Sequence, residues 1–457
     1  MCSMLETDYL VVGAGALGMI FVDELLNDPT ARVVIVDRRH AAGGHWVDAY
    51  PFVRLHQPSA FYGVGSRTLG SRRLHVDGPN AGCYEMASGA EVVAHFEALM
   101  QERFLRSERV TFLPMRDHEG EGRVRSLVTG DVLEVRHRTL VDATWFRTSI
   151  PLTHTPEFEV DAGVSVVTPN ELPRTAPGHR KFCVLGGGKT GMDACLFLME
   201  TGVRPDQIRW IVPRAAWCLN RQAVQPGGGV LAASEANLLE AAAGATSSDD
   251  LFDKLEARGE MLRIHADVRP VRLRNAILSP GEAKLLARIS DVVRMGRVSR
   301  ITADRLVLAH AELPAGPDDL YVDCTASATN PGPPIPVFQP GRITLQTLRS
   351  RFICLSIALT ARVERMELSA DEKNALCRPI PLPRSMEDFP MIMLRGFEAE
   401  ARWLAHPVVR DWMAANRLSG AGYPELTSDD PAVVAVQARV SAVRVRAIAN
   451  LARLSGE

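Results

Sequence analysis

Hydrophobic runs alternate with helix-like stretches in an order that occurs twice along the chain. An apolar run at 8–12 precedes a glycine-rich turn, a helical pattern through Leu26 and a second apolar run at 32–36. The same order returns over 181–212. Strand, glycine turn, helix and strand within about 30 residues are typical of a βαβ dinucleotide-binding unit. The pattern therefore predicts two such units.

The remaining pattern predicts the rest of the secondary structure. Residues 232–294 and 371–457 have the Ala- and Leu-rich periodicity of helices, and 150–177 is a proline-rich linker. We expect a further helix at 90–104 and strands at 110–113, 133–136, 139–143, 300–308 and 320–324.

The first glycine turn has the spacing Gly13-x-Gly15-x-x-Gly18. Glycine at these positions permits a tight turn, close approach to a pyrophosphate and packing of the helix on the strand. Asp37 ends the second strand, where its carboxylate accepts ribose hydroxyls and repels a 2′-phosphate. With the next residue, Arg38, it completes a predicted FAD or NAD site. The alternative is a turn that binds nothing, and the strand, helix and Asp37 around it argue against that alternative.

The second glycine turn differs in charge. Its predicted contacts with a dinucleotide are Gly186, Gly188, Lys189, Thr190 and Gly191. Arg214 stands where the first unit has Asp37, and an arginine there pairs with a 2′-phosphate. NADPH is therefore preferred over NADH, with Arg221 as a second candidate cation. An ATP-binding Walker loop is rejected because it requires glycine at the position of Cys183.

The segment after the first unit reads Gly43-Gly44-His45-Trp46, followed by Tyr50-Pro51. In this it resembles flavin-containing monooxygenases and their Baeyer-Villiger and N-hydroxylating relatives. The resemblance implies FAD at the first turn, with Gly44, His45 and Trp46 along the cofactor. It also implies that His56 and Gln57 lie near the flavin ring. His56 stands where Baeyer-Villiger enzymes have a catalytic aspartate, so their proton chemistry does not transfer unchanged.

One motif of that family is missing. Its members carry Phe-x-Gly-x-x-x-His-x-x-x-Tyr/Trp before the second turn, whereas the corresponding residues 158–170 have no histidine at the matching place. A disulfide reductase would use the same two folds, but it needs a pair of redox cysteines at close spacing. The eight cysteines of this chain contain no such pair.

The order of the motifs predicts an α/β fold with two Rossmann-like domains, a helical insert and a helical C-terminus. The FAD domain is discontinuous, and the NAD(P) domain is inserted into it. We expect the first part of the FAD domain at 1–165 and the NAD(P)H domain at 166–320, with its insert at about 230–295. The second part of the FAD domain then follows at 321–457. Segments 141–144 and 322–326 resemble the crossings between such domains, and 339–344 should return toward the flavin.

The amino-acid composition limits the classes of partner that the chain is expected to bind. The formal net charge is -2, hydrophobic residues make up 46% and charged residues 23%. Such a balance disfavours nucleic acid or an anionic membrane as a partner. The first seven residues lack a basic leader, no run is apolar enough to span a membrane, and the cysteines have no zinc spacing. We expect a cytoplasmic protein without a metal, and both a monomer and a homo-oligomer are compatible with this composition.

These observations lead to one function and two alternatives. The favoured function is that of an FAD-dependent, NADPH-linked oxidoreductase, a monooxygenase that inserts one oxygen atom from O2 into a small organic substrate. Its predicted catalytic residues are His56, Gln57 and Arg221. The first alternative is a flavin oxidase or dehydrogenase that does not use NADPH. The second is a non-catalytic dinucleotide-binding protein.

Overall fold

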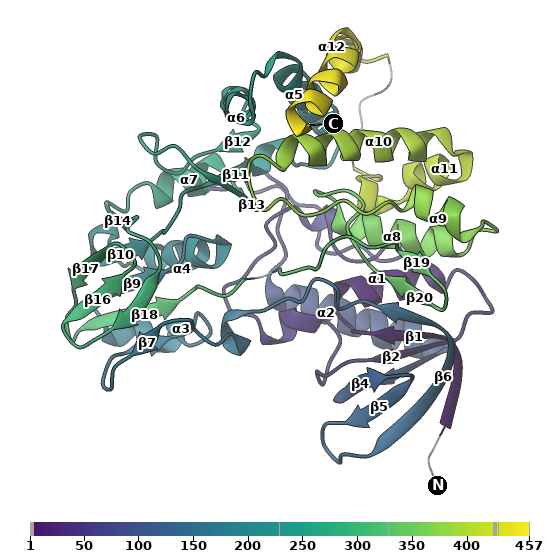
Figure 1. Ribbon diagram of the computed structural model, residues 1–457, viewed down its shortest axis with the longest axis horizontal. Coiled ribbons are helices and arrows are strands. Elements are labelled where there is room, and N and C mark those ends of the chain that lie inside the picture. Colours follow the sequence, from purple (N-terminus) through teal and green to yellow (C-terminus); the bar gives the residue numbers. More distant parts are fainter. Residues whose placement is uncertain (1–3, 228, 328, 424–426, 428, 457) are drawn as a thin grey trace.

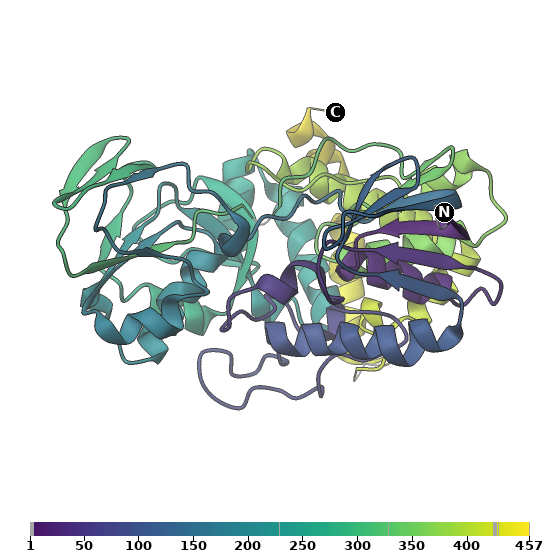
Figure 2. The same ribbon diagram turned by 90° about the horizontal axis from the view of Figure 1, so that it is seen from below.

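The computed structural model describes residues 4–227, 229–327, 329–423, 427 and 429–456, with Arg274 described by its backbone alone. Two lobes, each built on its own sheet, lie side by side, and a group of helices lies across the top of Figure 1. Figure 2 shows the same two lobes from below. Among the described residues, no helix has both the length and the apolar character needed to cross a bilayer.

The first sheet joins the N-terminal part of the chain to a segment more than 300 residues later. Its main path is β19 (Phe338–Gln339), β20 (Arg342–Thr344), β6 (Val132–Asp142), β1 (Met4–Val12), β2 (Val33–Val36) and β3 (Val110–Leu113). Strand β20 runs parallel to β6, which runs parallel to β1. A hairpin of β4 (Arg116–Gly120) and β5 (Arg123–Ser126) attaches to β6. Residues 339–344 therefore join the first sheet, and their predicted place near the flavin stays a prediction.

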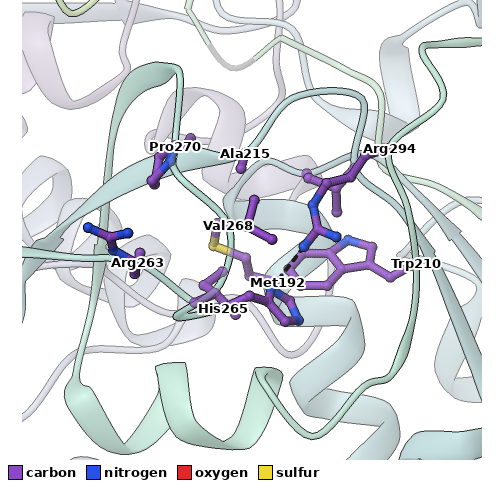
Figure 3. A pocket seen from close by; sticks show the side chains of 12 residues that line it. Met192, Trp210, Ala215, Arg263, His265, Val268, Pro270 and Arg294 are labelled. Carbon is purple, nitrogen blue, oxygen red and sulfur yellow. Dashed lines mark hydrogen bonds between the residues drawn. The ribbon is translucent and has the colours of Figure 1, made fainter. Parts of the chain in front are cut away.

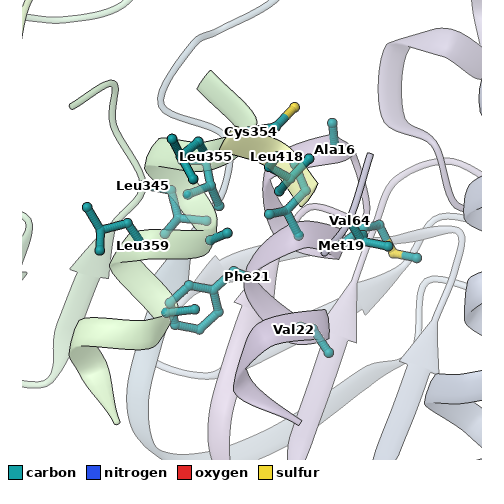
Figure 4. Packing of buried hydrophobic residues seen from close by; sticks show 14 of the residues in the cluster. Ala16, Met19, Phe21, Val22, Val64, Leu345, Cys354, Leu355, Leu359 and Leu418 are labelled. Atoms are coloured by element: carbon teal, nitrogen blue, oxygen red, sulfur yellow. The ribbon is translucent and has the colours of Figure 1, made fainter. Parts of the chain in front are cut away.

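Two helices from distant parts of the chain share the core of the first domain. Helix α1 (Ala16–Leu25) packs against α8 (Ile353–Glu364). Figure 4 shows Phe21 on the side of α1 that faces α8, whereas Met19 lies beside Val64 on the other side. Helix α2 (Gly89–Leu99) is capped by Ser88 and continues into a π-helical turn at Met100–Phe104. Because α8 is nearly all buried, the late segment is part of this core.

The second sheet is parallel throughout. Its strands in order are β14 (Asp291–Val293), β10 (Ile208–Ile211), β9 (Lys181–Leu185), β18 (Asp319–Asp323) and β8 (Val166–Val167). Helix α4 (Lys189–Glu200) follows β9, and α7 (Pro280–Leu286) packs against α4. An adjoining sheet contains β17 (Ala311–Pro314), β16 (Arg305–Leu308), β15 (Val298–Ile301) and β7 (Glu159–Val160).

A third core holds the helices at the top of Figure 1. It contains α5 (Val230–Gly244), α6 (Ser248–Ala257), α10 (Phe389–Ala405) and α12 (Pro431–Ser455). Beneath them lies a small sheet of β12 (Met261–Leu262), β11 (Ala216–Asn220) and β13 (Arg272–Leu278). Helices α9 (Ala370–Leu376) and α11 (Pro407–Ala415) complete the C-terminal part.

Several predicted elements need correction. The strands expected at 133–136 and 139–143 are one strand, β6, and the strand expected at 300–308 is the hairpin of β15 and β16. The stretch 232–294, expected to be mostly helical, also contains β12, β13 and β14. Strand β13 pairs with β11 and buries Leu273 and Ile277, so burial on a sheet outweighs the helical pattern around it. The proposed domain boundaries stay predictions.

Candidate functional site

The first glycine turn is built as its spacing predicts. Gly13 has φ +110°, and its N–H donates to the carbonyl of Val36 at 2.8 Å. A Cβ on Gly18 would lie 1.9 Å from the Gly13 carbonyl oxygen, so glycine is required where the helix packs on the strand. Gly15 is the N-cap of α1 and supplies no side-chain cap. The N–H groups of the first turn of α1 therefore point out of the helix without a side-chain acceptor.

Asp37 lies beside this turn, with 7% of its surface exposed. Its carboxylate accepts the N–H of Ala14 at 2.6 Å and the N–H of Arg39 at 2.7 Å. These bonds hold the carboxylate at the end of β2. Arg38 instead lies at the surface, where it pairs with Asp117 of β4 at 2.6 Å.

The Gly-Gly-His-Trp segment packs directly on the first turn. The N–H of Gly43 donates to the Ala14 carbonyl at 2.9 Å, and a Cβ on Gly44 would lie 2.7 Å from Cα of Gly15. His45 stacks on Trp46 with the ring centres 5.2 Å apart. Burial, followed by the charge of Arg39, lowers the pKa of His45 to about 4. Trp46 donates its indole N–H to the Tyr62 hydroxyl at 2.6 Å. The structure thus brings these residues to the turn, as their predicted place requires.

The second glycine turn has the same build. Gly186 has φ +122°, and a Cβ there would lie 2.5 Å from the carbonyl oxygen of Cys324. The Trp210 indole donates to the Gly186 carbonyl at 2.9 Å, while a Cβ on Gly191 would lie 2.1 Å from that same oxygen. Gly188 is the N-cap of α4, again without a side-chain cap. This helix terminus is equally suited to an anion.

Lys189 and Thr190 form the first turn of α4, and Lys189 is paired within its own helix. Its ammonium forms an ion pair with Asp193, and the two side chains are 12% and 11% exposed. The hydroxyl of Tyr50, from the first domain, donates to Asp193 at 2.8 Å. Burial, followed by the charge of Asp193, raises the pKa of Tyr50 well above its ordinary value. The cation of this turn is therefore largely neutralised by Asp193.

Arg214 is exposed, three residues after β10 ends at Ile211. The expectation that it stands where the first unit has Asp37 is wrong, because Gly13 donates to Val36 and Gly186 donates to Ile211, so the residue that matches Asp37 is Val212. Desolvation, followed by the charges of Arg272 and Arg297, lowers the pKa of Arg214. The guanidinium groups of Arg272 and Arg297 thus act on Arg214, although Arg297 is itself paired with Glu157 at 3.0 Å. Such a cluster suits a doubly charged phosphate.

A small cavity opens between the second glycine turn and the end of β10 (Figure 3). Met192, Trp210 and Val212 form an apolar part of its lining. Arg294, at its rim, hydrogen-bonds Nδ1 of His265 at 3.1 Å. Its lining is of the kind that binds a flat ring with polar substituents, but its volume of about 20 Å³ has room for a single water molecule.

The predicted catalytic residues lie where the two domains meet. Burial, followed by the charges of Lys189 and Arg221, lowers the pKa of His56 well below its ordinary value, so the ring is neutral. Gln57 donates its side-chain N–H to the carbonyl of Phe61 at 3.3 Å. Arg221 is 1% exposed and makes four hydrogen bonds to protein groups. Its direct catalytic contact stays a prediction.

Sequence reasoning missed several residues that complete this region. Asp193 stands four residues after Lys189, a helical spacing that already signals the ion pair. Glu282 is part of a capping box that starts at Ser279, so its sequence context predicts a helix start and gives no sign of its contact with Arg221. Nothing in the sequence signals that Tyr50 and Asn80, from the first domain, reach these residues.

Comparison with known proteins gives one group of relatives and a set of structures. No family model matches the chain. Uncharacterized proteins of Mycobacterium tuberculosis and Mycobacterium bovis are each 44% identical over 418 residues, which cover 91% of this chain and 78% of each relative.

The similar solved structures share little sequence with the chain. An oxidized steroid monooxygenase bound to NADP is 15% identical with a TM-score of 0.49, covering 98% of each chain. A flavin-containing monooxygenase from Stenotrophomonas maltophilia is 16% identical with a TM-score of 0.46, covering 82% of this chain and 100% of that one. A cyclohexanone monooxygenase from Rhodococcus sp. Phi1 bound to NADP+ is 14% identical with a TM-score of 0.48, covering 82% and 89%.

Proposed function

The chain belongs to the family of these uncharacterized mycobacterial proteins, and we propose that it is a flavoprotein oxidoreductase using FAD and NADPH. One observation carries the proposal. Two helices with uncapped N-termini follow glycine turns at the carboxyl ends of parallel strands, one in each of the two main sheets. Asp37 directly follows the next strand in one domain, whereas in the other Arg214 stands three residues after the next strand ends at Ile211. The two sites therefore select different dinucleotides.

The residues of the first turn fit FAD. Gly15 and Gly44 approach so closely that their backbones form a cradle without side chains, which is what a pyrophosphate at the α1 N-terminus requires. Asp37 still has lone pairs for ribose hydroxyls, and its charge disfavours a 2′-phosphate. His45 and Trp46 directly follow Gly44 in the chain, and their rings stack on each other.

The residues of the second turn fit NADPH. Its diphosphate would meet the N–H groups at the start of α4, beside Gly186, Gly188, Lys189, Thr190 and Gly191. The residues beside Trp210 and Val212 have the apolar character that an adenine ring needs, but the cavity there measures about 20 Å³ and would have to widen to admit the ring. Arg214 stands two residues after Val212, where it could meet the 2′-phosphate.

Bound FAD would supply the redox chemistry, taking a hydride from NADPH and passing electrons to an acceptor. The protein's own part is to hold the two dinucleotides and to exclude water between them. Neutral His56 has one ring nitrogen able to accept a proton or a hydrogen bond, and Gln57 offers an amide beside it. The resemblance of residues 43–51 to flavin monooxygenases favours O2 as acceptor, with a small organic molecule as oxygenated substrate.

One observation favours the alternative of a flavin oxidase or dehydrogenase. Lys189 is engaged by Asp193, so the second turn offers less positive charge to a diphosphate than its sequence suggests. In that case the substrate would reduce the flavin, and NADPH would not.

Anaerobic mixing of the purified protein with NADPH and with NADH, followed by flavin absorbance, separates these functions. Bleaching by NADPH at lower concentration than by NADH supports the proposal. Bleaching by neither nucleotide would overturn it in favour of the alternative.

Gly15→Ala tests the first site directly. Gly15 has φ -75°, which suits alanine, and its new methyl would lie 3.5 Å from Cα of Gly44 in ordinary contact. The fold should therefore keep its stability, while the methyl blocks the pyrophosphate and FAD is lost. Gly178→Ala, whose methyl meets no atom within 4 Å, is the control and should retain FAD. Full flavin occupancy in Gly15→Ala would count against the site.

A further inference from the structure

A buried arginine joins the two domains at the predicted flavin-facing segment. Arg221 follows β11 in the second domain, and its Nε donates to the backbone carbonyl of His56 at 2.8 Å. Its Nη1 donates to the side-chain oxygen of Asn80 at 2.5 Å and to Glu282 at 2.7 Å. Its Nη2 donates to the carbonyl of Ile277 at 3.1 Å.

These bonds divide between the two domains. Glu282 and Ile277 belong to the same domain as Arg221 and hold its guanidinium in place. His56 and Asn80 belong to the first domain and accept the other two hydrogen bonds. A planar guanidinium with several directed donors is the one side chain that can serve all four acceptors together.

A second contact holds the same interface. Residues 75–83 of the first domain, which we call the strap, form a narrow loop closed by the bond between Gly82 N–H and the His75 carbonyl. In Figure 2 the strap segment leaves the first lobe and runs below the second. The Ser279 hydroxyl donates to the Pro79 carbonyl at 2.6 Å. A Cβ on Gly281 would lie 2.3 Å from that carbonyl oxygen, so the strap lies against bare backbone at the start of α7.

Asn80, within the strap, completes the arrangement. It accepts from Arg221 and donates its own N–H to Glu282 at 3.1 Å. The strap thus closes over the Arg221–Glu282 pair, which is almost wholly removed from water. In such a setting each bond is strong, and an unpaired partner is costly.

We infer that Arg221 is a positioning residue that fixes the His56 segment to the second domain and thereby sets the distance between the two dinucleotide sites. The inference rests on the proposed function. The carbonyl that Arg221 holds belongs to the residue predicted to face the flavin, and Tyr50, six residues earlier, donates to Asp193 of α4 at 2.8 Å. Hydride transfer depends steeply on the separation of donor and acceptor, so a segment free to shift by about 1 Å would slow it strongly.

Arg221→Lys is the principal test. Lysine keeps the charge that Glu282 needs, but its three donors all leave one nitrogen, so they cannot replace the four bonds that the guanidinium makes from three nitrogens. Domain docking should survive, because the Tyr50–Asp193 bond and the stacked pair of Phe52 and Phe197 join the same domains independently.

Two further variants loosen the strap and leave the Arg221 side chain itself in place. Asn80→Ala removes the bonds of Asn80 to Arg221 and Glu282, and Gly281→Ala forces the strap away from α7. Asp77→Ala changes an exposed residue of the strap and is the matched control.

Anaerobic stopped-flow reduction of the FAD-loaded protein by NADPH gives the first measurement. The limiting reduction rate at saturating NADPH should fall about 100-fold in Arg221→Lys and about tenfold in the two strap variants. The half-saturating NADPH concentration and the FAD content should stay unchanged, as should every parameter of Asp77→Ala. A general loss of structure would instead move all of them together.

Hydrogen exchange followed by mass spectrometry gives a measurement independent of turnover. Peptides covering 54–58 should exchange faster in Arg221→Lys, while those in the first sheet should not change. If Arg221→Lys exchanges at 54–58 as slowly as the wild type, or is reduced at the wild-type limiting rate, the inference is overturned. If NADPH fails to reduce the wild-type flavin, the proposed function is wrong, and the exchange result alone decides whether Arg221 holds the segment.

Discussion

The close approach of Gly44 to Gly15 leads to a prediction whose magnitude follows from the structure. Gly44 has φ +60°, in the left-handed region, and a Cβ there would lie 2.7 Å from Cα of Gly15. Alanine at this position therefore carries two separate costs. The left-handed backbone costs roughly 1–2 kcal/mol for a residue with a Cβ. The overlap with backbone, which cannot rotate away, adds about 1–3 kcal/mol.

A second glycine separates the two costs. Gly130, between β5 and β6, has φ +78°, and a Cβ there meets no atom within 4 Å. Gly130→Ala therefore carries the backbone cost alone. The difference between the two variants isolates the overlap, which we expect to be about 1–3 kcal/mol.

Urea unfolding at equilibrium measures both variants, and flavin absorbance after gel filtration measures FAD retention. Gly44→Ala should be the less stable of the two and should lose FAD, whereas Gly130→Ala should keep it. Equal unfolding free energies would refute the steric argument. Full FAD retention in a folded Gly44→Ala would refute the place of this segment along the cofactor.

Two other predictions concern charge. Arg214→Ala should raise the Michaelis constant for NADPH about tenfold or more, because a charge-assisted bond to the 2′-phosphate is lost, and should leave the Michaelis constant for NADH unchanged. Arg204→Ala, which changes an exposed arginine, is the control. An equal change for both nucleotides, or a similar effect of Arg204→Ala, would contradict the assignment of Arg214. Burial, followed by the charges of Arg417 and Arg67, lowers the pKa of His95 from 6.5 to about 4. Between pH 6.5 and about 4, His95 is protonated in the unfolded chain but neutral in the folded protein. The stability that neutral His95 contributes is therefore fully present above pH 6.5 and is lost as the pH falls toward about 4. His95→Gln should remove about 2 kcal/mol of the stability lost between pH values of about 8 and 5, and an unchanged pH dependence of urea unfolding would contradict this.

The parts of the fold that the sequence predicted are those with local signals. The strands at 110–113 and 181–185 match β3 and β9, since each is a short apolar run bounded by polar residues. Strands β7 and β8 have only two residues each and owe their pairing to distant partners in β15 and β18. Such elements have no periodicity of their own to detect.

The same distinction applies to the candidate site. The glycines could be placed because a Cβ at Gly18 or Gly191 collides with the carbonyl of its own turn. The local spacing of the glycines therefore predicts them without knowledge of distant partners. The partners of Arg221 could not be placed, because they lie 56 to 165 residues away in the sequence. A buried arginine also looks the same in the sequence whether it meets a ligand or another domain.

The charges around the second turn indicate which end of its ligand is recognised. Lys189 would ordinarily attract a diphosphate, but Asp193 neutralises it and Tyr50 completes that pair. The exposed Arg214 carries its charge two residues after Val212, which lines the cavity beside Trp210, while Arg297 is paired with Glu157. A ligand lacking a 2′-phosphate would therefore meet the backbone N–H groups of α4 but little net charge. Discrimination between the two nicotinamide nucleotides should accordingly come from the adenosine end, and a lysine at the glycine turn carries less of it than the sequence suggests.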